Sequence, residues 1–199
     1  MNNEIIVILG RKGSGKTYLA RRLMADKRRL IVYDPIRQLG DLGVVVHDPV
    51  ALIAYIRQNC HRNFRVVYQP QVNIRDNGVM FAEFQNVLEM AYYTKNVYLF
   101  LDEIFLYIPR TINPTIIDNL ITAGRHSQIS FITTTIRYTD TSRKLTSQAD
   151  VMICFQTQEP ADIKYLKDIY GDAAEKLKTL PPYHYLKIDR GTVTEERPV

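Results

Sequence analysis

The feature that most constrains the fold is an eight-residue stretch near the N-terminus, Gly-Arg-Lys-Gly-Ser-Gly-Lys-Thr, at positions 10–17. A short apolar, β-branched run precedes it at positions 5–9, and apolar residues at helical spacing follow it. Glycine lets the backbone turn tightly and approach a ligand closely, and a strand, a glycine-rich loop and a helix in this order form a phosphate-binding P-loop. The stretch therefore predicts an α/β fold in which a P-loop joins the first strand to the first helix.

The residue types in this loop follow from the chemistry of phosphate binding. Successive backbone N–H groups form a nest for oxyanions, and the helix N-terminus adds a positive partial charge. Lys16 is expected to reach the β- and γ-phosphates of ATP, and the hydroxyl of Thr17 is expected to ligate Mg²⁺. The predicted nucleotide-binding residues are Gly10, Arg11, Lys12, Gly13, Ser14, Gly15, Lys16 and Thr17. The alternative is an ordinary glycine-rich turn.

A second apolar run, at positions 97–101, ends in the two carboxylates of Asp102 and Glu103. This pattern looks like the Walker B motif that accompanies a P-loop. Asp102 is expected to bind Mg²⁺ beside Thr17, and Glu103 to act as the general base toward the water that attacks the γ-phosphate. Without the P-loop, the same residues would indicate only a cap of the next segment. A Glu directly after the Asp favours a hydrolysing motor ATPase over a switch-type GTPase.

Length and composition limit the possible domain organisation, partners and location of the protein. The chain has 199 residues, which suits one P-loop ATPase domain over residues 1–199. Its formal net charge of +5 is compatible with a nucleic-acid partner, although a solvated basic face beside a phosphate site explains the basic N-terminal part equally well. Cys60 and Cys154 lack metal-site spacing. No apolar stretch approaches the ~20 residues of a membrane span, so we expect an intracellular protein without a transmembrane segment.

Apolar periodicity predicts alternating strands and helices along the rest of the chain. Strands are expected at 30–33, 44–46, 65–68, 129–135 and 151–155, and helices at 49–58, 79–93, 115–123, 140–147 and 161–170. Gly124 is expected to end a helix in the left-handed conformation, and residues 104–114 to form a loop. Asp34 follows the second strand, either as a ligand contact or as a turn-forming residue. Segments 185–188 and 192–194 predict a terminal hairpin.

Further residues carry a likeness to one family. They are Gly124-Arg125-His126, Thr135-Ile136-Arg137 and Gln148-Ala149-Asp150, followed by Phe155 and Glu159-Pro160. Together with the two motifs, they make the chain resemble the viral genome-packaging ATPases of the HerA/FtsK superfamily, especially those of icosahedral viruses with an internal membrane, such as the turreted virus of Sulfolobus. The resemblance covers nearly the whole chain. It implies an additional-strand, RecA-like P-loop fold with a mostly parallel central sheet, helices on both faces and a C-terminal β-hairpin.

This resemblance also implies a function. The family members are ATP-driven motors that translocate double-stranded DNA into a viral capsid, as a homo-oligomeric ring of five or six subunits at the capsid or portal vertex, in the host cytoplasm. An arginine from one subunit completes the ATP site of its neighbour and stabilises charge on the transferring phosphoryl group. Arg125 matches this arginine finger best, and Arg137 and Arg143 are alternatives. A cation near the helix dipole is the other interpretation of Arg125.

One position departs from the family pattern. The family has Gln just before the arginine that ends the sensor strand, and this chain has Ile136 there. Either Thr134 or Thr135 replaces it as the sensor, or the coupling to nucleotide differs. Arg75 and Arg110 lie in the loops that this topology would bring toward DNA, where contacts go to phosphates. Ordinary solvated arginines are the alternative for both.

Three other functions share part of the pattern. A zonula-occludens-toxin-like phage assembly or export ATPase has the same P-loop branch but usually carries a transmembrane segment. A small nucleotide kinase would need an acceptor site and an arginine-rich lid, and Glu103 beside Asp102 disfavours it. A nucleotide-binding interaction protein that does not hydrolyse ATP is disfavoured by Lys16 and Glu103.

Overall fold

A nine-stranded β-sheet forms the centre of the computed structural model, which describes residues 3–73, 75–108 and 114–197. The strands are β1 (Ile5–Leu9), β2 (Arg29–Tyr33), β3 (Val44–Val46), β4 (Phe64–Tyr68), β5 (Val97–Leu101), β6 (Ile129–Thr135), β7 (Val151–Phe155), β8 (Tyr185–Asp189) and β9 (Thr192–Glu196). The α-helices are α1 (Lys16–Met24), α2 (Pro49–Asn59), α3 (Asn77–Thr94), α4 (Pro114–His126), α5 (Arg143–Ser147) and α6 (Pro160–Tyr170). Short 3₁₀ segments are η1 (Gly40–Leu42), η2 (Ile104–Leu106), η3 (Tyr138–Asp140) and η4 (Gly171–Lys178).

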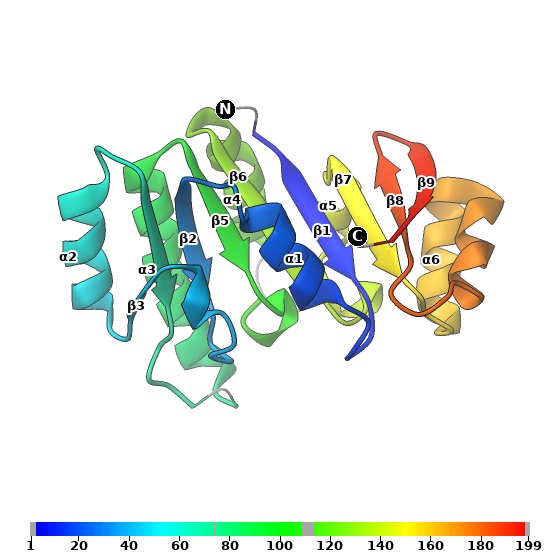
Figure 1. Ribbon diagram of the computed structural model, residues 1–199, viewed down its shortest axis with the longest axis horizontal. Coiled ribbons are helices and arrows are strands. Elements are labelled where there is room, and N and C mark those ends of the chain that lie inside the picture. The colour runs from blue at the N-terminus through cyan, green and yellow to red at the C-terminus, as the bar shows by residue number, and fades with distance from the viewer. Residues whose placement is uncertain (1–2, 74, 109–113, 198–199) are drawn as a thin grey trace.

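The strand order across the sheet is β3-β4-β2-β5-β6-β1-β7-β8-β9 (Figure 1). Strands β1 to β7 pair in parallel, and β8 and β9 add an antiparallel hairpin next to β7. The predicted mostly parallel sheet and the terminal hairpin are therefore confirmed. Strand β6 lies between β1 and β5, which is the place that the additional-strand form of the P-loop fold assigns to it.

The order of the three central strands, β5, β6 and β1, decides where a ligand-binding site lies. In the sheet, Leu9 at the end of β1 is opposite Thr135, and Leu101 at the end of β5 is opposite Thr133. Parallel strands end at the same edge of a sheet, and ligands of open α/β sheets bind at that edge. The residues that follow β1, β5 and β6 are consequently brought together, although they are about 90 and 30 positions apart in sequence.

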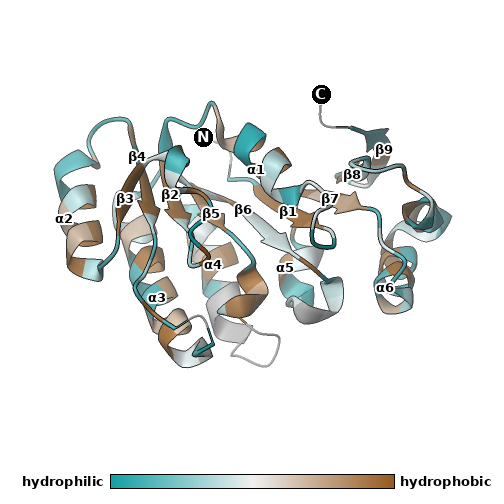
Figure 2. Ribbon diagram, turned by 60° about the horizontal axis from the view of Figure 1, so that its bottom comes forward, coloured by the Kyte–Doolittle hydropathy of each residue, from teal (hydrophilic) through white to brown (hydrophobic). Residues whose placement is uncertain are grey.

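Both faces of the sheet are covered, as predicted. Figure 2 shows α1 on one side of the sheet and α3, α4 and α5 on the other. On the first side, Leu19 and Met24 of α1 pack with Ile8 of β1. On the second side, Phe84 of α3 belongs to the cluster that contains Val7 of β1. Successive side chains of a strand point to opposite faces of the sheet. Strand β1 is therefore buried on both faces and packs with the helices on each side.

Two local predictions are wrong. Gly124 does not end α4 in a left-handed conformation, because the N–H of Ser127 still bonds the carbonyl of Ala123 at 2.9 Å and the helix continues to His126. The left-handed residue is Gln128, with φ 55°. Residues 104–106, expected within a loop, form the 3₁₀ turn η2. Within the described ranges, no helix is both long enough and apolar enough to span a bilayer.

Candidate active site

The glycine-rich loop has a backbone that most residues could not adopt. Gly15, the N-cap of α1, has φ 104°, in the left-handed region that favours glycine. A Cβ at Gly10 would lie 2.4 Å from Oγ of Ser14 and 2.8 Å from Cβ of Phe155. The N–H of Gly10 also bonds the carbonyl of Thr135 at 3.2 Å, which ties the loop to the end of β6. The loop is therefore held in its turn by both geometry and contacts.

Lys16 lies across this loop and is buried, with only 5% of its surface exposed. Its Nζ donates to the carbonyl oxygens of Gly10 at 2.7 Å and Arg11 at 3.4 Å. The same ammonium lies 3.6 Å from Oε1 of Glu103. The first residue of α1 thus brings a positive charge to the carboxylates that follow β5.

Asp102 and Glu103 are held by one hydroxyl from β6. Oγ1 of Thr134 donates to Oδ1 of Asp102 at 2.7 Å, and the backbone N–H of Glu103 donates to the same Oγ1 at 2.8 Å. Asp102 is only 2% exposed. Glu103 has φ 47°, a left-handed conformation that costs a non-glycine residue about 1–3 kcal/mol and that clusters at functional sites.

Among the described residues of the loop and the acidic pair, two polar side-chain atoms are buried and have no hydrogen-bond partner. They are Oγ of Ser14 and Oε2 of Glu103. Buried polar groups are nearly always paired, because an unsatisfied one costs about 1–3 kcal/mol. Two such atoms, one in the glycine-rich loop and one on the carboxylate that pairs with Lys16, indicate a site built to hold polar groups of a ligand.

The electrostatics of the acidic pair follow from burial. Burial raises the pKa of Asp102 above its ordinary value, against the hydrogen bond from Thr134, which lowers it. Burial also raises the pKa of Glu103, and the charge of Lys16 opposes that rise. Asp34 is a further buried carboxyl close enough to raise the pKa of Asp102. It accepts from the N–H groups of Gln38 and Leu39 in its own turn, and from the side-chain amide of Gln69 at the end of β4.

The structure separates the two candidate sensor threonines. Thr134 contacts both acidic residues, as described above. The hydroxyl of Thr135 instead donates to the carbonyl of Arg137 at 3.2 Å and accepts from Thr141 at 3.0 Å. Only Thr134 is therefore placed to respond to changes at Asp102 and Glu103.

The candidate arginines lie in different places. Arg125 is exposed in the last turn of α4, just before β6 begins. It lies at the opposite edge of the sheet from the P-loop, roughly 20 Å away at ~3.3 Å per strand residue. Arg137 lies at the P-loop edge and pairs with Glu159 at 2.5 Å. Arg143 begins α5, where its guanidinium lies over the ring of Tyr165, 5.8 Å from the centroid.

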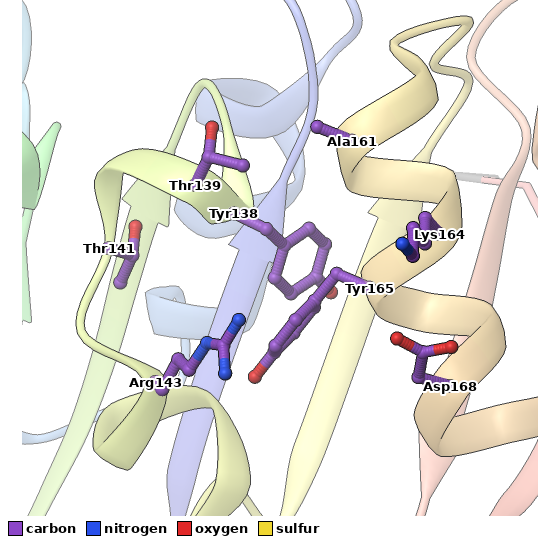
Figure 3. Close-up of a pocket in the computed structure, with 8 residues that line it drawn as sticks. All are labelled: Tyr138, Thr139, Thr141, Arg143, Ala161, Lys164, Tyr165 and Asp168. Atoms are coloured by element: carbon purple, nitrogen blue, oxygen red, sulfur yellow. The ribbon is translucent and has the colours of Figure 1, made fainter.

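Figure 3 shows Arg143 and Tyr165 in a cavity of about 250 Å³ that Lys164 and Asp168 of α6 also line. This cavity does not include the P-loop residues or the acidic pair. Of the two candidate DNA contacts, Arg75 is exposed just before α3, and its N–H bonds the side chain of Asn73. Arg110 lies outside the described residues.

A group of residues that the motifs did not indicate also lies beside the P-loop. They are Phe155, Gln156, Pro182, Tyr183 and His184, which line a cavity of about 230 Å³ together with Arg11, Gly13 and Ser14 of the loop. Arg11 donates to Oε1 of Gln156 at 3.2 Å. In the sequence, the Pro-Pro pair before Tyr183 predicts only the end of a helical segment, so its position at the P-loop could not be foreseen.

Comparison with known proteins finds similar chains among solved structures. No protein-family model and no curated protein sequence matches the chain. Among solved structures, the genome packaging NTPase B204 from Sulfolobus turreted icosahedral virus 2 in complex with ATP-gammaS has a TM-score of 0.79 and 27% identity, covering 100% of this chain and 98% of that one. B204, the DNA-packaging ATPase from Sulfolobus turreted icosahedral virus, has a TM-score of 0.77 and 29% identity, with 100% of both chains covered.

A third structure shows how widely the fold is shared. VirB4 of Thermoanaerobacter pseudethanolicus has a TM-score of 0.70 at 12% identity, over 98% of this chain and 89% of that one. This likeness concerns the fold alone. The resemblance predicted from the motifs is confirmed at the level of the packaging ATPases: over its whole length, the chain is similar in fold and sequence to the viral genome-packaging NTPase B204.

Proposed function

We propose that the chain is an ATP-hydrolysing motor that moves double-stranded DNA into a viral capsid. The observation that carries this proposal is the convergence of Lys16, Asp102, Glu103 and Thr134 at one sheet edge, around buried polar atoms that have no partner. Two similar proteins are a genome packaging NTPase in complex with ATP-gammaS and a DNA-packaging ATPase. An ATPase site on the fold of packaging motors supports this function over nucleotide binding alone.

In this proposal, residues 10–17 bind the phosphates of ATP. Their backbone N–H groups form the oxyanion nest. The Nζ of Lys16, whose partners are two loop carbonyls and Glu103, would exchange part of this set for phosphate oxygens. The unpartnered Oγ of Ser14 is a further donor at the same loop. The loop therefore offers a positive charge and several donors to one anionic ligand.

Thr17 and Asp102 would hold Mg²⁺. Mg²⁺ usually takes one or two carboxylates together with substrate phosphates and waters, rather than an all-protein cage. Asp102 is such a carboxylate: it is buried, and it lies close enough to Lys16 for that charge to lower its pKa. When bound, Mg²⁺ would neutralise charge on the phosphates. The hydrogen bond from Thr134 would orient the Asp102 carboxylate toward it.

Glu103 would act as the general base. Its Oε2 is buried without a partner, so this oxygen is the one available to accept a proton from water. Burial raises the pKa of the carboxyl, which makes it a stronger base, while Lys16 at 3.6 Å favours the ionised form. Positioned acid–base catalysis typically contributes 10²- to 10⁴-fold to a rate.

Arg125 would complete the site of a neighbouring subunit. Its edge of the sheet is opposite to the P-loop edge, so it cannot reach the ATP site of its own subunit. In a ring built from head-to-tail contacts, one edge of each subunit faces a different edge of the next. Five or six copies of a single domain, residues 1–199, would then share sites between neighbours. Arg137 and Arg143 fit this role less well, because each already has a partner on its own chain.

DNA and the capsid would be the macromolecular partners, and the site of action would be the host cytoplasm, at a vertex of the virion. The net charge of +5 supports a polyanionic partner. Contacts of this kind go to phosphates and weaken as salt rises. Arg75, exposed on the P-loop side of the sheet, is one candidate contact, and Arg110 is another.

The test is to measure ATP binding and phosphate release for the wild type and Glu103→Gln, with and without linear double-stranded DNA. We expect Glu103→Gln to bind ATP as the wild type does and to hydrolyse it at least ~100-fold more slowly. Glu89→Gln, at an exposed position of α3, is the matched control and should behave as the wild type. A wild type that transfers phosphate to a nucleotide instead of releasing it would indicate the kinase alternative.

A further inference from the structure

Tyr183 occupies a backbone position that normally belongs to glycine. The N–H of His184 bonds the carbonyl of Pro181 at 3.1 Å and closes a β-turn, with Pro182 second and Tyr183 third. Tyr183 has φ 66°. Proline at the second position and a left-handed third residue are typical of a type II turn, which prefers glycine or asparagine there. The turn therefore presents a tyrosine at a cost in backbone strain, and such strain often marks a functional position.

The turn is anchored on both sides. Leu180 before it and Tyr185 after it are buried, at 3% and 6% exposed. The ring of Tyr185 packs on Phe155, with centroids 5.3 Å apart. His184 pairs with Glu195 of β9 at 3.2 Å. Because the flanking residues are fixed in this way, the position of Tyr183 between them is fixed as well.

This anchored ring lies against the P-loop. The segment that leads into β8 passes beside the loop after β1 (Figure 1), and both line the cavity of about 230 Å³. A Cβ at Gly15 would lie 3.4 Å from Cδ1 of Tyr183 and 3.4 Å from Cε1 of Phe155. Phe155 is buried, whereas Tyr183 is 61% exposed. The outer face of the Tyr183 ring is thus an open aromatic surface next to the predicted phosphate site.

We infer that Tyr183 is the platform on which the base of the bound nucleotide stacks. This inference rests on the proposed function and adds the subsite for the base. The phosphates of a nucleotide held by residues 10–17 fix one end of the ligand, and the base then falls within reach of the adjoining cavity. Sites that enclose a whole drug-sized ligand have volumes of ~300–1,000 Å³. This cavity is smaller, as a subsite for the base alone would be. The ring supplies the apolar face that a base requires.

Stacking recognises the face of a base and not its edge, so it tolerates different bases. The polar side chains that line the cavity with Tyr183 are Arg11, Ser14, Gln156 and His184. Gln156 and His184 already have partners, Arg11 and Glu195 respectively. We therefore assign the affinity for the base to Tyr183. The binding of GTP should depend on Tyr183 as much as the binding of ATP does.

The experiment compares two probes by calorimetric titration in the presence of Mg²⁺: ATP-gammaS, which has a base, and inorganic tripolyphosphate, which has none. In Tyr183→Ala we expect the affinity for ATP-gammaS to fall about tenfold, which lies within the range measured for base–aromatic stacking. The affinity for tripolyphosphate should not change. Tyr183→Phe should bind both probes as the wild type does. Tyr93→Ala, at a similarly exposed tyrosine of α3, is the matched control.

Tyr183→Gly separates binding from folding. Glycine adopts a positive φ freely, so this variant should unfold at a higher temperature than Tyr183→Ala and yet bind ATP-gammaS equally weakly. Unchanged binding of ATP-gammaS by Tyr183→Ala would overturn the inference, and so would an equal loss of both probes, which would mean that the ring only supports the loop. A wild type that binds neither probe would instead overturn the proposed nucleotide site itself.

Discussion

The Oγ1 atom of Thr134 lies 2.7 Å from Oδ1 of Asp102, to which it donates a hydrogen bond, and it accepts a second bond from the N–H of Glu103 at 2.8 Å. One hydroxyl thus links the end of β6 to both residues of the acidic pair. The family that this chain resembles has Gln at the position of Ile136, which cannot sense a phosphate. The contacts of Thr134 support it as the residue that takes over this role.

Replacing Thr134 by valine tests this link. Thr134→Val keeps the shape of the side chain but leaves a buried carboxylate oxygen and a buried N–H without their partner, so we expect a loss of about 1–3 kcal/mol in the free energy of unfolding. Losing the group that orients a metal ligand typically costs ~10- to 100-fold in activity. Chemical denaturation and phosphate release measure the two effects.

The control for this substitution is Thr133→Val. Thr133 is equally buried, but its hydroxyl donates only to the carbonyl of Leu101, at 3.0 Å. We expect this variant to lose stability and to keep most of its hydrolysis rate. Equal loss of hydrolysis in the two variants would contradict the special role of Thr134.

The pKa of Glu103 predicts how stability depends on pH. Burial raises this pKa above its ordinary value of 4.5, so the folded state holds the proton more tightly than the unfolded state. The stability that this proton contributes is complete below pH 4.5 and is lost as the pH rises through the pKa of the folded state. Glutamine does not titrate, so Glu103→Gln should unfold at a higher temperature than the wild type at pH 7.

Thermal unfolding of the wild type and Glu103→Gln between pH 4 and pH 8 checks this prediction. The advantage of the variant should shrink as the pH falls toward 4.5. The exposed Glu89→Gln variant should show no such trend. A wild type that is the more stable protein at pH 7 would show that Lys16 more than offsets the burial of the Glu103 carboxylate.

Gly124 offers a test of the end of α4. It lies within the helix, and a Cβ there would come no closer than 3.9 Å to Ile129. Gly124→Ala should therefore raise the free energy of unfolding by roughly 0.5–1 kcal/mol, because alanine is the better helix former. A left-handed residue would instead lose about 1–2 kcal/mol on the same change. Urea denaturation distinguishes the two signs.

Arg29 lies in the basic N-terminal part of the chain but has a structural role. Its guanidinium donates to five backbone carbonyls, those of Cys60, Arg62, Thr94, Lys95 and Asn96, at 2.7–3.3 Å. Lysine lacks the planar fork and has fewer donors. Arg29→Lys should therefore cost about 2–4 kcal/mol of stability, whereas Arg28→Lys at the neighbouring exposed position should change it by less than ~0.5 kcal/mol. Equal effects would contradict the role of this network.

The parts of the site that the sequence predicts are local. The strand before Gly10, the helix that starts at Lys16 and the strand before Asp102 each follow from a contiguous run of residues. The choice between Thr134 and Thr135 does not, because it depends on the register of β6 against β5, which no local pattern specifies. Tyr183 reaches the P-loop from a turn far along the chain, so only the folded topology brings it there.

Two other differences between the sequence predictions and the structure concern Gly124 and Arg29. Gly124 matches a common helix-end signal, but helical hydrogen bonds past it outweigh that local preference. Arg29 belongs to a run of basic residues that predicts a solvated or DNA-binding face, and its carbonyl partners come from segments more than 30 positions away. Sequence patterns thus predict the elements and the motifs, while contacts between distant segments decide which polar side chain does what.

The measurement that tests the central claim most directly is the rate of ATP hydrolysis per subunit as a function of protein concentration, with and without linear double-stranded DNA. A ring motor with shared sites predicts a rate that rises steeply with concentration and is stimulated by DNA. Arg125→Ala should abolish this rate and still bind ATP, and His126→Ala at the same exposed helix end should retain it. A rate per subunit that is independent of concentration, of DNA and of Arg125 would contradict the account.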